Sequence, residues 1–251
     1  MFESRRTFLS LAARALGAHA IEAADNSPSG PEFVRMDAVA SAFMGAHSVP
    51  GMSVAVAHDG HVLYDRAFGF ADRDNNEKVT PAHLFRIASV SKPVTSVTLF
   101  RLIEDNRLTL EDPVFGPRGV LGDDFGQRPY QQWVEEIRVK HLLTHTSGGW
   151  QNDRTDPMFR NEAMNHQQLI AWTIKNVPLQ YPPGQHYAYS NFGFCVLGRV
   201  IEKLTGARYE QHVRDAILKP CGVSDMRIGG NTQAERAPLE VVYYDVGGQS
   251  P

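Results

Sequence analysis

The sequence predicts an α+β fold, with an antiparallel hairpin followed by a largely helical chain. Two strand-like runs, 52–57 and 62–70, flank Asp59-Gly60, a residue pair that favours a tight hairpin turn. From residue 94 onward, apolar side chains recur at helical spacing in segments separated by Gly- and Pro-rich turns. With 251 residues, 42% of them hydrophobic, the chain can form one large domain or two intertwined ones.

The remaining elements follow in chain order. A helix is expected over 33–46, before the hairpin, and a polar loop over 72–81, after it. Apolar side chains at helical spacing predict further helices over 94–103, ending near Asn106, and over 192–204, ending at Gly206. Helices are also expected over 137–143, 167–175 and 209–218. One strand-like run, Leu239 to Tyr244, is expected in the tail.

The first residues are typical of an export signal. Residues 4–9, Ser-Arg-Arg-Thr-Phe-Leu, resemble the twin-arginine signal of bacteria, and an Ala- and Leu-rich stretch follows. That stretch is interrupted by Arg14, His19 and Glu22, so it is too polar to span a bilayer and no stable membrane insertion is expected. The alternative is an amphipathic N-terminal helix of a cytoplasmic protein.

This pattern predicts three regions and a location. Residues 1–24 are the expected export signal, 25–32 a Ser- and Pro-rich linker, and 33–251 the folded domain, with its helical region over about 82–225. An exported chain would be periplasmic or secreted.

Composition excludes several classes of function. The net charge is −3 and no basic run interleaves with aromatic residues, so a nucleic-acid partner is not expected. Two cysteines, Cys195 and Cys221, make neither a disulfide framework nor a metal cluster, and we expect two buried thiols. His141 and His145 have a helical i, i+4 spacing that zinc can use, but no acidic ligand lies between them, so no metal is expected. Nothing in the sequence implies a cofactor.

One short stretch carries the chemistry. Ser89 and Lys92 are three residues apart where a loop enters an apolar helix, which places both side chains on one face. A serine hydroxyl needs a base to become a nucleophile, and a desolvated lysine can lose its proton near neutral pH. Free N–H groups at a helix start also suit a developing oxyanion. The alternative is an ordinary N-cap serine beside a solvated lysine.

A second block opens another apolar helix one hundred residues later, at Tyr189-Ser190-Asn191. Together with residues 85–93 (Phe-Arg-Ile-Ala-Ser-Val-Ser-Lys-Pro), residues 141–148 (His-Leu-Leu-Thr-His-Thr-Ser-Gly) and Pro183-Gly184, it resembles the penicillin-recognising serine hydrolases. This is the broad β-lactamase family related to class C β-lactamases, D,D-peptidases and D-aminopeptidases. The resemblance covers residues 35 to 245, and it implies a β-lactamase/transpeptidase-like fold.

The resemblance also implies roles. Ser89 would attack a carbonyl and become acylated, and Lys92 would hold positive charge and share a proton with Tyr189. A tyrosine beside a cation is more easily deprotonated, so it can act as base and later as acid. Asn191 would bind Lys92 and the substrate amide, and the Ser89 N–H would supply one oxyanion donor. His145 is expected to be structural. The alternatives are a packed aromatic for Tyr189 and an N-cap for Asn191.

The sequence departs from the family at its third motif, a Lys or His followed two residues later by Gly on a strand beside the nucleophile. The tail offers Val246-Gly247-Gly248 instead, so the resemblance implies that only the first strands of the antiparallel sheet are present and that the chain is a fragment or a truncated product. A missing oxyanion donor on that strand would cost on the order of 100- to 1000-fold in rate. We therefore expect weak activity and self-association through an exposed sheet edge.

Two functions from different classes remain. The first is a serine hydrolase that forms an acyl-enzyme with an ester, a β-lactam or a D-amino-acid peptide. The second is a non-catalytic homologue or fragment that binds a peptide or a partner in the same groove. An α/β-hydrolase is excluded because the sequence contains no G-x-S-x-G elbow.

Overall fold

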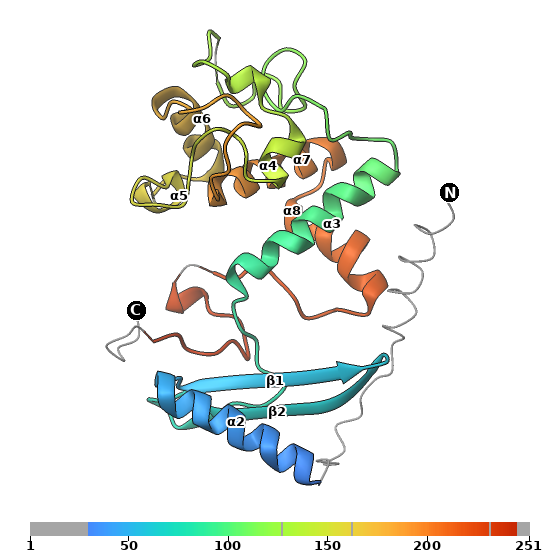
Figure 1. Cartoon of the computed structure of the whole chain (residues 1–251), viewed down its shortest axis with the longest axis vertical. Coiled ribbons are helices and arrows are strands. Elements are labelled where there is room, and N and C mark those ends of the chain that lie inside the picture. The colour runs from blue at the N-terminus through green and yellow to red at the C-terminus, as the bar shows by residue number, and fades with distance from the viewer. Residues whose placement is uncertain (1–29, 127, 162, 231, 245–251) are drawn as a thin grey trace. The chain divides into compact units, whose positions relative to one another are not determined.

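The computed structural model describes residues 30–126, 128–161, 163–230 and 232–244, and these form two compact units (Figure 1). Of the described residues, 30–87, 227–230 and 232–244 belong to the first unit, and those between 88 and 226 belong to the second. The expected export signal and most of the expected linker lie outside the described residues. Among the helices that are described, none combines the length and apolar character needed to cross a bilayer.

The first unit is built on the predicted hairpin. Strands β1 (Gly51–His58) and β2 (His61–Asp72) pair antiparallel, and β3 (Glu77–Lys78) adds a short third strand beside β2. The turn residues Asp59 and Gly60 have φ of 50° and 76°, the left-handed conformations that a two-residue hairpin turn needs. The hairpin prediction is therefore confirmed.

Helix α2 (Pro31–His47) lies along this hairpin (Figure 1). It begins at a proline, which fits the first turn because the N–H it lacks would have no helical partner there. The Phe33 ring stacks on Tyr64 with 6.1 Å between centroids, and the Tyr64 hydroxyl donates to Asp37 Oδ1 at 2.6 Å. Of the α2 side chains only Ala40 is buried.

The tail of the chain corrects two expectations. Leu239 to Tyr244 is not a strand: it makes one isolated bridge, between Glu240 and Leu84, and Leu239 has a φ of +63°, which breaks an extended run. The Glu240 carboxylate is buried and accepts from Arg86 Nε at 3.0 Å, a polar interaction that an alternating pattern does not reveal. In addition, β3 lies inside the segment 72–81, which was expected to be a loop.

The second unit is helical. Its α-helices are α3 (Ser91–Glu104), α4 (Val139–Leu143), α5 (Pro157–Arg160), α6 (His166–Asn176), α7 (Asn191–Thr205) and α8 (Tyr209–Val213), the last continuing as a π-helical turn to Leu218. Helix α7 is central, because α3, α4, α5 and α8 all pack against it. The core around it is fully buried and includes Leu99, Leu102, Phe115, Val134, Ile137, Leu142, Ile170, Phe192, Leu197 and Ile201.

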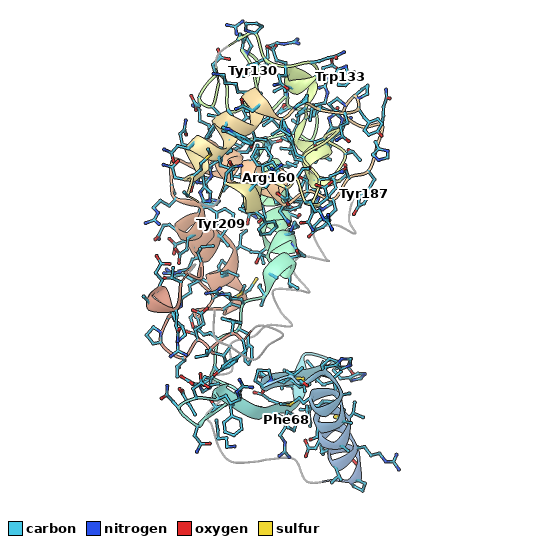
Figure 2. All side chains as sticks on the ribbon, turned by 90° about the vertical axis from the view of Figure 1, so that its left-hand side faces the viewer. Phe68, Tyr130, Trp133, Arg160, Tyr187 and Tyr209 are labelled. Atoms are coloured by element: carbon cyan, nitrogen blue, oxygen red, sulfur yellow. The ribbon has the colours of Figure 1, made fainter. Side chains whose placement is uncertain are left out.

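The stop signals read from the sequence act as expected. Asn106, with a φ of +56°, lies two residues beyond the end of α3, and Gly206 caps α7 with a φ of +72°. On the first turn of α8, Tyr209 (labelled in Figure 2) shares a 2.7 Å hydrogen bond with the buried Thr95 hydroxyl of α3. This bond and the α7 core together hold α3 in place.

Candidate active site

Ser89 lies in a 3-10 turn, Ala88–Val90, that leads into α3. The turn starts at Ala88 with a φ of +43°, a left-handed conformation that costs an alanine about 1 kcal/mol or more. Ser89 is exposed and does not cap the helix, because the N-cap residue is Val90 and no side-chain cap bond is made there. The alternative reading of Ser89 as an ordinary N-cap is therefore wrong.

Lys92 is the second residue of α3 and lies beside Ser89. Its Nζ donates to Ser89 Oγ at 3.1 Å and to Asn191 Oδ1 at 2.8 Å. Among the described residues Lys92 makes no ion pair within 4.0 Å, so its charge is held by neutral oxygens and by aromatic rings. The Tyr189 and Phe194 ring centroids lie 4.7 and 5.6 Å from Nζ.

Tyr189 and Asn191 complete the cluster from the start of α7. The Tyr189 hydroxyl donates to Ser89 Oγ at 2.6 Å, although the two residues are one hundred positions apart. Asn191 is the first residue of α7, and the cap is Ser190, whose Oγ accepts from Gly193 N at 2.9 Å. The structure thus brings together all four residues that the sequence singled out, and it assigns the cap to the residue between two of them.

The positive charge of Lys92 acts on Tyr189. The hydrogen-bonding interaction with Lys92, followed by the bond to Ser89, lowers the pKa of the Tyr189 phenol below its ordinary value. A phenol with a lowered pKa is more readily present as phenolate, and a phenolate 2.6 Å from Ser89 Oγ can take the serine proton. A serine hydroxyl and a phenol so placed have the geometry and the electrostatic bias that acyl transfer by a nucleophile and its base requires.

His145 contacts the backbone on both sides of Tyr189. Its Nδ1 accepts from Ser190 N at 3.1 Å, and its carbonyl oxygen accepts from Ala188 N at 2.8 Å. The imidazole lies 4.4 Å from the Tyr189 ring, and burial, with a contribution from Lys92, lowers its pKa. A neutral ring that accepts at Nδ1 carries its proton on Nε2. These contacts support the expected structural role.

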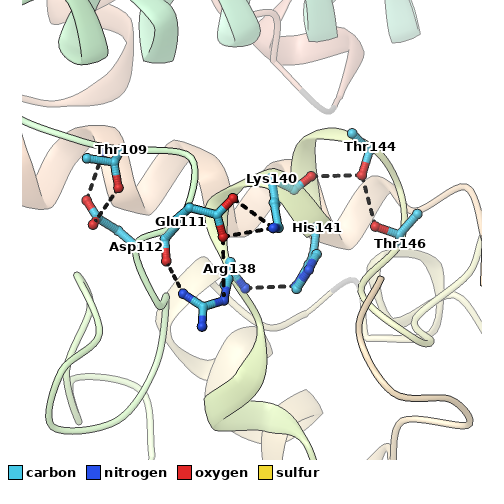
Figure 3. A network of polar contacts seen from close by, with 8 residues as sticks. All are labelled: Thr109, Glu111, Asp112, Arg138, Lys140, His141, Thr144 and Thr146. Carbon is cyan, nitrogen blue, oxygen red and sulfur yellow. Dashed lines mark hydrogen bonds and ion pairs between the residues drawn. The ribbon is translucent and has the colours of Figure 1, made fainter. Parts of the chain in front are cut away.

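The His141 ring, like that of His145, accepts a hydrogen bond from the backbone, and it lies within the network of Figure 3. Its Nδ1 accepts from Arg138 N at 3.1 Å and caps α4, while Lys140 pairs with Glu111 at 2.8 Å and Thr144 bonds to Thr146 at 2.9 Å. Within the described part of the chain, no three His, Cys, Asp or Glu side chains cluster as a metal site would require. The histidine pair is explained by hydrogen bonds to the backbone.

Two further residues at the site were missed by the sequence reading. Asn191 Nδ2 donates to Asn152 Oδ1 and to Asp156 Oδ2, both at 3.1 Å, and Asp156 is fully buried. Both lie between the helices expected over 137–143 and 167–175, in a stretch for which the sequence predicted no element. One signal was available: an aspartate directly before Pro157 has the pattern of a helix N-cap, and Asp156 does cap α5.

Comparisons with known proteins show the family of the chain. A family model described as Beta-lactamase matches residues 36–250. "Esterase EstB" of Burkholderia gladioli is 32% identical over 229 residues, which cover 84% of this chain and 54% of the esterase. "Protein flp" of Staphylococcus aureus strain MRSA252 is 25% identical over 81% of this chain and 39% of its own. The chain thus spans about half the length, or less, of these curated relatives.

Solved structures give the same fold. The octameric penicillin-binding protein homologue from Pyrococcus abyssi superposes with a TM-score of 0.70 at 24% identity, over 88% of this chain and 50% of that one. The D-amino acid amidase from Ochrobactrum anthropi SV3 superposes with a TM-score of 0.63 at 27% identity, over 80% of this chain and 54% of that one. Because the family model spans most of the sequence, this chain belongs to the beta-lactamase family.

Proposed function

We propose that the chain carries the acyl-transfer site of a serine hydrolase, with Ser89 as nucleophile. The observation that carries the proposal is the pair of contacts at Ser89 Oγ, 2.6 Å to the Tyr189 hydroxyl and 3.1 Å to Lys92 Nζ. A nucleophile in contact with its base, and a base biased by a fixed cation, is the arrangement that covalent catalysis needs.

The proposed reaction has two steps. Ser89 Oγ attacks a carbonyl carbon while its proton passes to the Tyr189 phenolate, and the new phenol then protonates the leaving alcohol or amine as that bond breaks. Water attacks the acyl-serine in the second step, giving its proton to Tyr189, and Ser89 recovers a proton when the acid leaves. Lys92 stabilises the phenolate throughout.

Asn191 is proposed to face the substrate through its oxygen. Both of its N–H groups are engaged, with Asn152 and Asp156, and Oδ1 accepts from Lys92. A carbonyl oxygen has a second lone pair, which can accept from the N–H of a substrate amide. The substrate-binding role expected for Asn191 is thereby retained as a prediction.

For the substrate we propose a carboxylic ester first, and a β-lactam or a D-amino-acid amide or peptide second. Support for the ester comes from "Esterase EstB", which is 32% identical, and support for the amide comes from the D-amino acid amidase structure at 27% identity. All three substrates present a carbonyl with a leaving group to the same serine.

A binding protein without turnover is the second candidate. The observation that favours it is that the Tyr189 hydroxyl donates a hydrogen bond to Ser89 Oγ, and a phenol that keeps its proton cannot act as a base. The two candidates predict different chemistry at Ser89, so one experiment separates them.

That experiment is the intact mass of the purified chain after reaction with a fluorophosphonate. An activated Ser89 displaces fluoride and gains one phosphonyl group, which the Ser89→Ala chain should not. Ser91→Ala is the matched control, because Ser91 is exposed and lies two residues away. A folded wild-type chain without adduct would support the binding protein. Aryl esters, a chromogenic cephalosporin and a D-amino-acid amide would then rank the substrates.

We also propose that the chain is exported by the twin-arginine route. The support is the Ser-Arg-Arg-Thr-Phe-Leu sequence at residues 4–9 and the Ala- and Leu-rich stretch after it. Residues 1–32 fused to a folded reporter should direct it to the periplasm, and replacing Arg5 and Arg6 by lysine should abolish that. A reporter that stays in the cytoplasm with both arginines intact would contradict the proposal.

A further inference from the structure

Asp156 is a buried carboxylate next to the reacting groups. Its side chain is fully buried where the chain enters α5, with Oδ1 accepting from Met158 N at 2.9 Å and Oδ2 accepting from Asn191 Nδ2 at 3.1 Å. Within the described residues no cation pairs with it directly. Burying a carboxylate costs desolvation free energy unless its oxygens are hydrogen-bonded. We therefore asked what the Asp156 carboxylate does beside Asn191.

The answer lies in the orientation of the Asn191 carboxamide. A carboxamide has one oxygen acceptor and two N–H donors on nearly symmetric arms, so it can sit in two flipped positions. Here Nδ2 meets two acceptors, Asn152 Oδ1 and Asp156 Oδ2, which leaves Oδ1 facing Lys92 at 2.8 Å. In the flipped position the amide nitrogen would meet the lysine ammonium, and its oxygen would meet two acceptors.

The loop that contains Asn152 and Asp156 also contacts Tyr189, the proposed base. The backbone N–H of Asn152 donates to the Tyr189 carbonyl oxygen at 2.7 Å, so one loop contacts both the Tyr189 backbone and the Asn191 side chain. Asp156 N donates to the Asp153 carbonyl oxygen at 3.0 Å, which closes the turn between the two ends of that loop.

We propose that Asp156 is a positioning residue, which fixes the Asn191 carboxamide with its oxygen toward Lys92 and so holds Lys92 against Ser89 and Tyr189. The inference rests on the proposed function, because it assigns Asp156 a part in activating Ser89. A carboxylate can serve here because it only accepts when ionised and can therefore satisfy both the Met158 and the Asn191 donors.

The test is Asp156→Asn, read as the rate at which a fluorophosphonate labels Ser89. An asparagine has one acceptor for two donors, so the Asn191 amide loses its fixed orientation and the charged bond from Lys92 weakens. A hydrogen bond to a charged group corresponds to about a 10- to 100-fold change, and we expect labelling to slow by that factor.

The pH dependence of labelling gives a second readout that loss of packing alone would not move. The groups facing the Tyr189 phenol are the Lys92 ammonium from α3, the Ser89 hydroxyl and the neutral His145 ring. If Lys92 is displaced, the Tyr189 pKa rises toward its ordinary value, so the increase of labelling with pH should shift to higher pH.

The matched control is Asp65→Asn, which makes the same chemical change at an exposed side chain of the hairpin unit and should label like the wild type. The rescue is a double variant. In the Asp156→Asn, Asn191→Asp double variant the amide and the carboxylate exchange places. The new asparagine then donates to the new aspartate, which accepts from Lys92, and labelling should recover at least tenfold over the Asp156→Asn chain.

Each outcome decides a different claim. A folded wild-type chain that takes no label overturns the proposed function. A wild-type chain that labels, beside an Asp156→Asn chain with the same rate and the same pH midpoint, overturns the positioning role alone. If Asp156→Asn does not fold by near-ultraviolet circular dichroism, the double variant decides: restored labelling supports the role, and a folded but unlabelled double variant refutes it.

Discussion

The two units of this chain bury their apolar side chains to very different degrees. In the helical unit, α7 alone has seven buried residues, and Trp150 packs edge-on against both Phe115 and Phe192. In the hairpin unit, α2 buries only Ala40, and exposed apolar side chains include Val34, Val39 and Phe43. The proposed reacting groups all lie in the well-packed unit.

The difference in burial matters for the proposed reaction, because the helical unit holds its side chains in the larger buried core of the two. Positioning a nucleophile to within a fraction of an ångström needs supporting side chains that are themselves fixed, which the α7 core supplies. A three-stranded sheet with one partly buried helix has little apolar area to stabilise it. We therefore expect the two units to respond differently to matched substitutions.

The largest expected effect comes from two lysines that each lie over an aromatic ring. Lys92 lies 4.7 Å from the Tyr189 ring centroid, and Lys78 of the hairpin unit lies 3.5 Å from that of Phe70. Lys92→Met should slow fluorophosphonate labelling about 10³- to 10⁴-fold, because the base loses its cation. Lys78→Met should leave the rate unchanged, and equal losses in both chains would contradict the assignment of chemistry to one unit.

Next come two phenylalanines in the two units. Phe192→Ala empties a fully buried position and should lower the free energy of unfolding by about 3–5 kcal/mol. Phe43 is 51% exposed, so Phe43→Ala should cost about 0.5 kcal/mol or less. Urea unfolding followed by circular dichroism measures both. A large loss for Phe43→Ala would show that the outer face of α2 is covered in solution.

Two tyrosines should have pKa values shifted in opposite directions. Lys92 lowers the pKa of Tyr189, whereas burial and the bond to Asp37 raise the pKa of Tyr64 to about 12. The phenolate absorbance of Tyr189 should therefore appear at lower pH than that of an ordinary tyrosine and that of Tyr64 near pH 12, with Tyr189→Phe and Tyr64→Phe chains assigning the signals. Since the folded pKa of Tyr64 is the raised one, its stabilising contribution is complete below pH 10 and is lost as the pH rises toward 12.

The smallest expected effect concerns self-association. If a second copy covers α2, burying Val39, which is 70% exposed, would contribute about 1–1.5 kcal/mol. Val39→Ser should then weaken a dimer about tenfold in sedimentation equilibrium. A wild-type chain that stays monomeric at high micromolar concentration would remove the prediction of self-association altogether.

Local signals predicted much of this fold. The positions of Asp59-Gly60, Asn106 and Gly206 have a left-handed backbone conformation that few residue types tolerate. The residue type at each position therefore predicts a turn or a helix end. The family motifs in turn predicted that Ser89 and Tyr189 meet across one hundred residues.

Other features depend on partners that are distant in sequence. Glu240 reads as part of a strand until its buried bond to Arg86, 154 positions away, is known. The burial of Asp156 depends on α7 packing against α5, and the N-cap pattern before Pro157 predicts a helix start there but not a buried carboxylate. Interactions of this kind override local propensity and become visible only in three dimensions.

The left-handed backbone at Ala88 has a consequence for transplanting this chemistry. A peptide of residues 85–105 would contain the whole Ser-x-x-Lys sequence, but free alanine strongly prefers negative φ, so the turn should open and the backbone coupling constant of Ala88 in NMR should report that change. Grafting the four residues onto another helix would therefore carry over the Ser-x-x-Lys sequence without this turn and without the contact between Ser89 and Tyr189. The left-handed conformation at Ala88 is one that the surrounding protein has to impose on the chain.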